Sequence, residues 1–423
     1  MDFYTSVVKY GNMILYRGVK NGRRTKLKLN YSPTLYTETT EDSPWKTLDG
    51  NNLLPHPFES IKEASEYINR YNKVENFKIY GNASFNYSFI ADEFKGMIDW
   101  DIDKIAVDII DIETKSDNGF PDPYKAQEEI TAITLTRLGR YPIAFGCGEY
   151  EVKGDEKYIK CRDEIDLCQQ FMDIWSSDPP DVLSGWNSRY FDVPYLFNRF
   201  KILQGETFAK RLSPWNIVNT KTTFQKTTGK ELTSYDLVGI GHLDYIELYK
   251  AFAKDGKTRE NYKLNTIANV ELGEGKLSYD EYDNLNQLYL NDYQKFQEYN
   301  IKDVDLIIRL EDKLKLIELS LTLAYDSKSN YEDVFTQTRM WDALTYNYLL
   351  EKHIIVPPKI MHEKESAFEG AFVKEPQVGR HKWVASFDLN SLYPNLIRQY
   401  NISPEKLVNK QDILDRIELL KSV

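Results

Sequence analysis

The sequence predicts a mixed α/β protein with more than one domain. Its 423 residues are 41% hydrophobic and 28% charged, which is ordinary globular usage and provides enough apolar side chains for two or three cores. Short strand-like runs alternate with helical patterns through most of the chain, whereas residues 293 to about 350 are mostly helical in pattern. No repeat or low-complexity linker marks a boundary, so the domains are separated only by these changes in pattern.

Residues 1–104 are expected to form an α+β domain. Strand-like aromatic runs occur at 3–8 and 13–16, and one amphipathic helix is predicted further along. The apolar face of that helix consists of Ile61, Ala64, Tyr67, Ile68 and Tyr71.

A basic stretch within this first domain predicts a β-hairpin. The pair Asn21-Gly22 is typical of a primed turn, and the basic residues on either side are Arg17, Lys20, Arg23, Arg24, Lys26 and Lys28. The net charge of −11 has the wrong sign for a chain that coats nucleic acid non-specifically, although it does not prevent a local basic groove. Two interpretations stay open, namely a solvated hairpin and a hairpin that contacts phosphates.

After the first domain the pattern changes to strand, loop, strand and then helix. Apolar runs at 105–112, 132–136 and 142–145 predict strands, and the run at 164–175 predicts a helix. This order is typical of an α/β domain with a mixed sheet. A second hairpin is expected within it at 221–240, around the turn sequence Thr228-Gly229-Lys230.

Asp111 and Glu113 lie two residues apart at the end of an apolar strand, so both side chains project from one face of a sheet. Carboxylates on one face repel each other unless a cation lies between them. The Asp-x-Glu spacing alone is weak, because acidic residues are common in this chain. The location gives stronger support, since a buried strand is not where solvated acids are expected.

Two further acidic positions have distinctive neighbours. Asp192 lies in the run Phe191-Asp192-Val193-Pro194-Tyr195, where an unpaired carboxylate would be costly; the alternative role is the N-cap of a helix expected at 194–200. Tyr299 and Asp303 are spaced i and i+4 in a helical stretch, so a phenol and a carboxylate share one face. The alternative for this pair is a surface hydrogen bond.

Taken in order, these motifs resemble those of 3′→5′ exonucleases of the DEDDy class, which have an RNase H-like fold. The resemblance implies that two divalent metals, roughly 4 Å apart, activate water and stabilise the leaving oxygen. It places the metal ligands at Asp111, Glu113, Asp192 and Asp303, and the residue that orients water at Tyr299. Hard oxygen ligands suit Mg²⁺ or Mn²⁺.

A fourth motif lies near the C-terminus, in Ser386-Phe387-Asp388-Leu389-Asn390-Ser391-Leu392-Tyr393-Pro394. It ends an apolar run at 383–387, which is expected to be a strand, and it resembles motif A of family B DNA polymerases. In that family the Asp binds both catalytic metals, the following backbone amides bind the triphosphate, and the Tyr rejects a 2′-hydroxyl. By resemblance, the metal-binding role falls on Asp388, and the nucleotide-binding roles fall on Ser391, Leu392 and Tyr393.

Other runs resemble DNA-contacting segments of the same family. Phe368-Glu369-Gly370-Ala371 is similar to a loop that touches template DNA, with Phe368 in place of the usual Tyr, so Gly370 and Ala371 are expected to contact DNA. Phe120 and Asn187 match positions that hold the frayed primer end. Further similarity is to replicative polymerases of T-even-like bacteriophages, which implies primer-template DNA and a single-stranded 3′ end as partners.

The family's motif B helix and motif C strand are not found in this sequence, which ends soon after Asp388. Polymerisation needs metals held by carboxylates from both motif A and motif C. Two explanations stay open, a truncated chain and a split polymerase. The split polymerase is favoured, and in it a second chain supplies fingers, motif C and thumb, and through that chain a sliding clamp. An apolar stripe on a helix expected at 412–420 favours such a partner.

The expected organisation is an N-terminal domain at 1–104 with a helical return at 315–360, an RNase H-like exonuclease domain at 105–314, and an incomplete palm at 361–423. Two alternatives stay open, a stand-alone DEDDy exonuclease and a non-catalytic nucleic-acid-binding repressor that uses the basic hairpin. Three cysteines without CxxC spacing, and no signal or membrane-spanning run, predict a cytoplasmic protein with no membrane partner.

Overall fold

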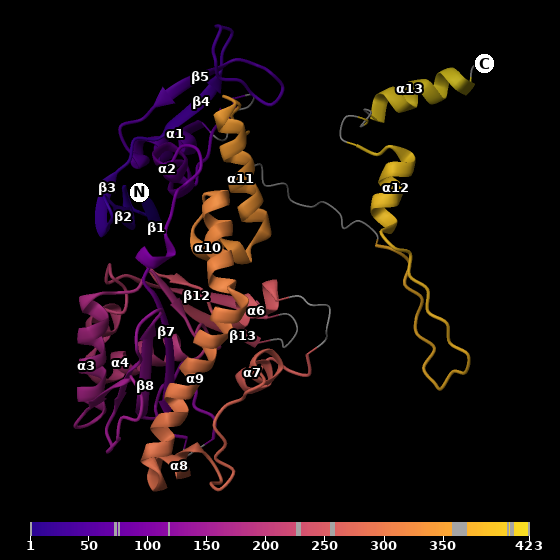
Figure 1. Ribbon diagram of the computed structural model, residues 1–423. Helices are drawn as coiled ribbons and strands as arrows, with labels where there is room; N and C mark the ends of the chain where they lie inside the picture. Colours follow the sequence, from indigo (N-terminus) through magenta and orange to yellow (C-terminus); the bar gives the residue numbers. More distant parts are fainter. Residues whose placement is uncertain are drawn as a thin grey trace. The chain divides into compact units, whose positions relative to one another are not determined.

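The computed structural model describes residues 2–71, 74, 77–116, 119–225, 230–253, 259–357, 370–403, 406 and 410–421. The described chain falls into two compact units, Met1–Ile360 and Met361–Val423 (Figure 1). The boundaries expected inside the first unit, at residues 104 and 314, stay predictions.

The first unit begins with an antiparallel β-meander. Its strands are β1 (Phe3–Tyr10), β2 (Met13–Lys20) and β3 (Arg23–Asn30). Lys20 pairs with Arg23, which leaves Asn21 and Gly22 as the turn, with φ values of 51° and 74°. Positive φ at both positions is the signature of a type I′ turn, so the predicted hairpin is confirmed.

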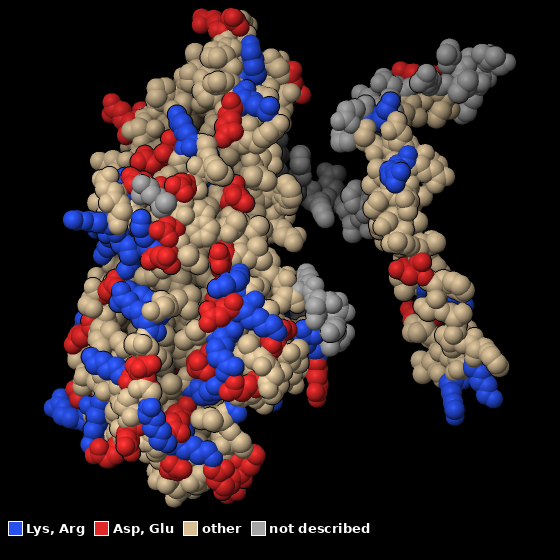
Figure 2. All heavy atoms as spheres, in the orientation of Figure 1, with Lys and Arg blue, Asp and Glu red and all other residues tan. Residues whose placement is uncertain are grey.

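Two arginines of this hairpin form ion pairs with acidic residues of a later segment of the unit. Arg17 is only 5% exposed and pairs with Asp181 at 3.1 Å. Arg24 pairs with Asp181 at 2.8 Å and also with Asp178, so both arginines join the meander to the loop before β11 (Val182–Ser184). The interpretation of a solvated hairpin is therefore wrong for Arg17. Over the visible face of the first unit, basic and acidic side chains are interspersed (Figure 2).

A second small sheet and two helices follow the meander. They are β4 (Thr34–Glu38), β5 (Leu53–Pro57), β6 (Ile79–Tyr80), α1 (Ile61–Tyr71) and α2 (Phe85–Glu93). Helix α1 buries Ile61 and Ala64 on its apolar face, which confirms the predicted amphipathic helix.

A mixed sheet with the strand order β10-β9-β8-β7-β11-β14 forms the centre of the first unit. The strands other than β11 are β7 (Val107–Thr114), β8 (Ile130–Arg137), β9 (Ile143–Gly146), β10 (Lys157–Lys160) and β14 (Gly241–His242). Strand β8 is antiparallel to both of its neighbours, β7 and β9. The remaining pairs, β9–β10, β7–β11 and β11–β14, are parallel. The predicted α/β domain with a mixed sheet is confirmed.

Alternation along β7 sends its side chains to both faces of the sheet. The helices that cover these faces are α3 (Glu164–Ser177) and α4 (Asp192–Gln204) on one face and α9 (Tyr293–Leu314) on the other (Figure 1). Ile110 and Ile112 pack in the core beneath α3 and α4, and Ile109 belongs to the core on the other face. Asp111 and Glu113 therefore lie on the face covered by α9.

Helices dominate the rest of the first unit. They are α5 (Glu206–Lys210), α6 (Tyr245–Phe252), α7 (Leu264–Leu272), α8 (Leu285–Asn291), α10 (Leu316–Ser327) and α11 (Gln337–Glu351), with 3₁₀ turns η1 (Ile102–Lys104) and η2 (Tyr331–Phe335). Helices α9 to α11 confirm the helical pattern predicted after residue 293. Tyr325 of α10 donates to the Tyr4 carbonyl at 2.7 Å, so this segment returns to the meander. In the described chain, no helix is long and apolar enough to cross a bilayer.

The second hairpin consists of β12 (Val218–Gln225) and β13 (Lys230–Leu237), which are antiparallel with Gln225 opposite Lys230. Its predicted turn around Thr228 and Gly229 lies outside the described residues. The hairpin is tied to the segment between β7 and β8 by Tyr124, whose hydroxyl donates to the Thr233 carbonyl and accepts from the Thr233 amide, both at 3.0 Å.

The second unit contains helices α12 (Leu392–Tyr400) and α13 (Lys410–Lys421). The helix predicted at 412–420 is confirmed, but the strand predicted at 383–387 is wrong, because this segment has no regular secondary structure. An extended run becomes a strand only when a neighbouring strand satisfies its backbone groups, and no strand pairs with it among residues 370–403. Phe368 and Glu369 lie outside the described residues.

Candidate active site

Three predicted ligands converge on one face of the central sheet. Asp111 and Glu113 come from β7, and Asp303 comes from α9, which crosses that face. A carboxylate oxygen from each lies within 4.8 Å of the others, which makes a group that could hold a metal ion. The predicted Asp-x-Glu pair and the predicted helical carboxylate are therefore neighbours in space, although about 190 residues separate them in sequence.

Asp192 lies next to this group but is not one of its three members. It is 3% exposed, and its Oδ1 accepts a hydrogen bond at 3.0 Å from the amide of Ile112, the residue between Asp111 and Glu113. Helix α4 begins at Asp192 itself, and Phe191 occupies the N-cap position. The alternative role of Asp192 as the N-cap is therefore wrong, because its carboxylate is bonded to β7 instead.

Burial raises the pKa of every carboxyl group here, and repulsion from neighbouring acids adds to it at Asp111 and Glu113. Burial is the main cause for Asp111, whose pKa is well above its ordinary value, and the neighbouring acids add to it. The same causes raise the pKa of Glu113 to about 8, whereas burial raises that of Asp192 to about 7. Burial also raises the pKa of Asp303. Such a cluster is costly when ionised, and a cation placed among the carboxylates would offset the cost.

The donor set fits a hard divalent cation. The group offers only carboxylate oxygens, which suit Mg²⁺ or Mn²⁺. One oxygen of Asp303, Oδ1, is buried and has no hydrogen-bond partner among the described residues. Buried polar atoms are normally satisfied, so this oxygen is free to bind a metal.

Tyr299 lies one helical turn before Asp303 on α9, as the spacing predicted. Its ring packs edge-on against Tyr279, with ring centroids 5.5 Å apart. Burial, and then the charge of Asp303, raise the pKa of the phenol, so the hydroxyl keeps its proton. The phenol is thus a hydrogen-bonding group fixed beside the carboxylates, and the alternative of a surface hydrogen bond is wrong, because Tyr299 is buried.

Lys276 is a site residue that no sequence pattern indicated. It lies in the segment between α7 and α8, and its Nζ donates to Asp303 Oδ2 at 2.5 Å and to the Tyr299 hydroxyl at 3.0 Å. Burial lowers the pKa of the ammonium group, but the charges of Asp303 and then Tyr299 raise it by more than burial lowers it. The pKa of Lys276 therefore lies above its ordinary value. The site therefore contains a permanent cation in addition to its acids.

Asn300 also belongs to the site and was missed from the sequence. Its Nδ2 donates to Asp111 Oδ2 at 2.7 Å, and its Oδ1 accepts from the hydroxyl of Thr134 on β8 at 2.5 Å. Asn300 follows Tyr299 directly, so the only available signal was its place within the Tyr-x-x-x-Asp motif.

The two predicted primer-end residues lie on loops near Asp192. Asn187 has φ of 66°, and its amide donates to Asp244 Oδ1 at 3.0 Å, so the backbone here is held in a left-handed conformation. Phe120 is 85% exposed, and its ring lies 5.2 Å from that of Phe191, the residue before Asp192. Their role in binding DNA stays a prediction.

The predicted polymerase residues lie in the second unit. Gly370, Ala371, Asp388 and the run 391–393 are all exposed there. Ser391 occupies the N-cap position of α12 with φ of 54°. In the described chain, Asp388 is not part of a group of carboxylates that could hold a metal.

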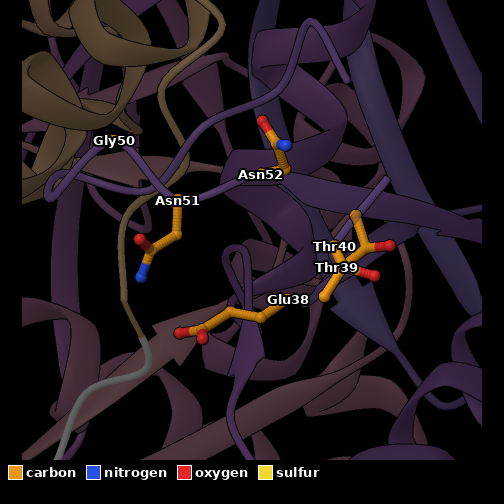
Figure 3. Close-up of a pocket in the computed structure, with 6 residues that line it drawn as sticks. All are labelled: Glu38, Thr39, Thr40, Gly50, Asn51 and Asn52. Carbon is orange, nitrogen blue, oxygen red and sulfur yellow. The ribbon is translucent and has the colours of Figure 1, made fainter. Parts of the chain in front are cut away.

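A hollow of about 800 Å³ lies elsewhere in the first unit (Figure 3). It is lined by polar residues at the end of β4 and in the loop before β5, namely Glu38, Thr39, Thr40, Gly50, Asn51 and Asn52. No predicted site residue is among them, so this hollow carries no part of the carboxylate chemistry.

Comparison with known proteins agrees with this geometry. A model of the DNA polymerase family B exonuclease domain matches residues 59–267, and a model of DNA polymerase family B matches residues 336–421. The chain is 33% identical to the DNA-directed DNA polymerases of Escherichia phage RB69 and Enterobacteria phage T4, over 96% of this chain and 47% of each relative. It is 27% identical to DNA polymerase 1 of Sulfurisphaera ohwakuensis, over 72% of this chain and 35% of that protein.

The chain thus spans about half the length of the phage polymerases that it matches. The matched models cover the strand that carries Asp111 and Glu113, the helix that begins at Asp192 and the segment that carries Asp388. With this similarity across both units and an acidic cluster at the face of a mixed sheet, the chain belongs to family B of the DNA polymerases.

Proposed function

We propose that the first unit is a 3′→5′ proofreading exonuclease and that the second unit begins a polymerase palm. The observation that carries the exonuclease proposal is the convergence of Asp111, Glu113 and Asp303 within 4.8 Å. Tyr299 and Lys276 lie against the third of these carboxylates, which supports a site built for hydrolysis. The substrate is a single-stranded 3′ end of DNA.

Asp111, Glu113, Asp192 and Asp303 would hold two Mg²⁺ or Mn²⁺ ions. Bound there, the ions would activate water and stabilise the leaving oxygen of the phosphodiester. The tyrosine hydroxyl, kept protonated by its surroundings, orients the attacking water by hydrogen bonding. The lysine ammonium offsets negative charge that the acids and the phosphate bring together.

DNA contacts are proposed at both units. Exposed Phe120 would stack on an unpaired base, and Asn187 would hydrogen-bond to the frayed strand. The hairpin of β12 and β13 would separate primer from template, while Gly370 and Ala371 would touch the template.

Polymerisation is proposed to need residues that carry motifs B and C, supplied by a second chain with fingers, motif C and thumb. Asp388 would bind both polymerase metals, Ser391 and Leu392 would bind the triphosphate, and Tyr393 would exclude a 2′-hydroxyl. Asp388 has no carboxylate partner in the described part of its unit, which supports a second acid from elsewhere. A sliding clamp would act through that second chain.

The exonuclease proposal is tested with a 5′-labelled single-stranded oligonucleotide in Mg²⁺. Progressively shorter labelled products indicate digestion from the 3′ end. The double variant Asp111→Ala with Glu113→Ala should abolish digestion, because two of the ligands are removed. Asp312→Ala, which removes an exposed carboxylate from the same helix as Asp303, is the matched control and should keep full activity.

Full activity in the double variant would contradict the metal-site assignment. Labelled mononucleotide as the first product would contradict the proposed polarity. Neither result would contradict the polymerase proposal, which concerns other residues.

A further inference from the structure

A chain of hydrogen bonds runs from the central sheet through α9 to a predicted metal ligand. The Thr134 hydroxyl donates to Asn300 Oδ1 at 2.5 Å, and Asn300 Nδ2 donates to Asp111 Oδ2 at 2.7 Å. Thr134 and Asn300 are both fully buried. Hydrogen bonds among buried groups are costly to break, because a lost partner is not replaced by water.

The backbone places these three residues together. Thr134 on β8 is the register partner of Asp111 on β7, so both side chains lie on the same face of the sheet. That face is covered by α9 (Figure 1). Tyr299, Asn300 and Asp303 lie on one arc of this helix.

The direction of the bonds fixes the orientation of the amide. A threonine hydroxyl can donate to the oxygen of an asparagine amide but not to its NH₂ group. With its oxygen bonded to Thr134, the amide must present its NH₂ group to Asp111. If the amide were flipped, its oxygen would face the Asp111 carboxylate and that contact would be lost, whereas the Thr134 hydroxyl could turn to accept from the NH₂ group. Asp111 therefore sets the orientation of the amide, and Thr134 holds the amide oxygen in place.

The consequence falls on the Asp111 carboxylate. One of its oxygens, Oδ2, is held by Asn300, which restricts rotation about the Cβ–Cγ bond. A carboxylate fixed in this way loses less conformational freedom when it binds a cation. Thr134 itself touches no member of the carboxylate group in any hydrogen bond described here.

We propose that Thr134 and Asn300 are positioning residues that preset Asp111 for metal binding. This inference rests on the proposed exonuclease function and adds two residues to it. Asn300 acts directly on the ligand, whereas Thr134 acts only through Asn300, by holding its amide oxygen in place.

The chain offers a matched control on the same strand. Thr136 lies two residues after Thr134, so its side chain is on the same face, and it is also buried. Its hydroxyl has no hydrogen-bond partner among the described residues. Thr136→Val therefore makes the same change of shape and polarity as Thr134→Val without breaking the chain of hydrogen bonds.

The test measures Mn²⁺ affinity of the full chain by electron paramagnetic resonance of free Mn²⁺, without DNA. Binding that is lost in the Asp111→Ala, Glu113→Ala variant defines the exonuclease site. Thr134→Val should weaken that binding about tenfold, and Asn300→Ala should weaken it by about 10- to 100-fold. Thr134→Ser keeps a hydroxyl and should stay close to wild type, as should Thr136→Val.

Thermal unfolding in EDTA accompanies each titration. A merely structural role would lower the melting temperature of Thr134→Val and leave its Mn²⁺ affinity unchanged, which would overturn the proposal. Equal affinities for Thr134→Val and Thr136→Val would also overturn it. If Asn300→Ala does not fold, the difference in Mn²⁺ affinity between Thr134→Val and Thr134→Ser still tests the proposal. Absence of Mn²⁺ binding in the wild-type chain would instead contradict the proposed exonuclease site.

Discussion

Removing one charge from the carboxylate cluster should stabilise the metal-free protein. Burial, and then the charge of Asp303, raise the pKa of Glu113 from 4.5 to about 8. Because the folded-state pKa lies above that of the unfolded chain, the folded state binds the proton more tightly. The resulting cost to stability is absent below about pH 4.5 and grows until about pH 8.

The size of the effect follows from the shift. Each pKa unit corresponds to about 1.4 kcal/mol. Because Glu113 ionises more readily in the unfolded chain, the free energy of unfolding of the metal-free protein is lower by about 3 kcal/mol at pH 7 and by about 1 kcal/mol at pH 5. Glu113→Gln removes this cost while keeping the shape of the side chain. The variant should therefore unfold at higher urea concentration, with a gain of about 2–3 kcal/mol at pH 7.

The assay is urea unfolding in EDTA at pH 5, 6 and 7, followed by far-UV circular dichroism. Glu66→Gln, on the exposed side of α1, is the matched control and should change stability by less than about 0.5 kcal/mol. Addition of Mg²⁺ should stabilise wild type more than Glu113→Gln, because the variant has lost a ligand. A variant no more stable than wild type at pH 7, or a gain that does not grow with pH, would refute this reasoning.

Three further predictions concern catalysis. Tyr299→Phe should slow hydrolysis about 100-fold with little loss of Mn²⁺ affinity, measured beside Asp303→Ala; an equal loss of affinity in both would show that their roles are not distinct. Shortening the 218–237 hairpin should spare digestion of single strands and impair digestion of mismatched duplex ends, whereas equal loss on both substrates would indicate misfolding. Mixed with a chain that carries motifs B and C, the protein should incorporate nucleotides; Asp388→Ala should remove incorporation while sparing exonuclease, and Tyr393→Ala should admit ribonucleotides, as primer-extension gels would reveal. Incorporation by these 423 residues alone would contradict the requirement for a second chain.

Local patterns were enough to predict much of the nuclease fold. The apolar run before Asp111 is a strand because its alternate side chains fill two different cores, and the Tyr299 and Asp303 spacing is one helical turn. The turn at Asn21-Gly22 followed from the conformational preference of two residues. In each case the physical cause lies within a few residues of the sequence.

Long-range contacts explain what the sequence did not predict. Lys276 and Asn300 join the site only because α9 and the segment after α7 are folded against β7. Nothing in the residues around Lys276 indicates this, and for Asn300 the only local signal is its place within the Tyr-x-x-x-Asp motif. An N-cap role for Asp192 is suggested by the helix expected directly after it in the sequence. Its carboxylate instead accepts a hydrogen bond from a strand amide 80 residues away. Residues 383–387 do not form the expected strand for a related reason: strand formation depends on a neighbouring strand that the local sequence does not specify.

Because Arg17 is buried, the meander cannot be removed from the first unit without leaving buried polar groups unpaired. Its guanidinium donates to the carbonyls of Pro180 and Gly239 at 2.6 Å and of Pro179 at 2.9 Å, and it pairs with buried Asp181. A fragment of the first unit that begins after the meander would keep the buried acid and three carbonyls but lose the donor that satisfies them. The meander is therefore an internal scaffold of the first unit, and a gene fusion or exchange would have to transfer it together with the central sheet to preserve the fold.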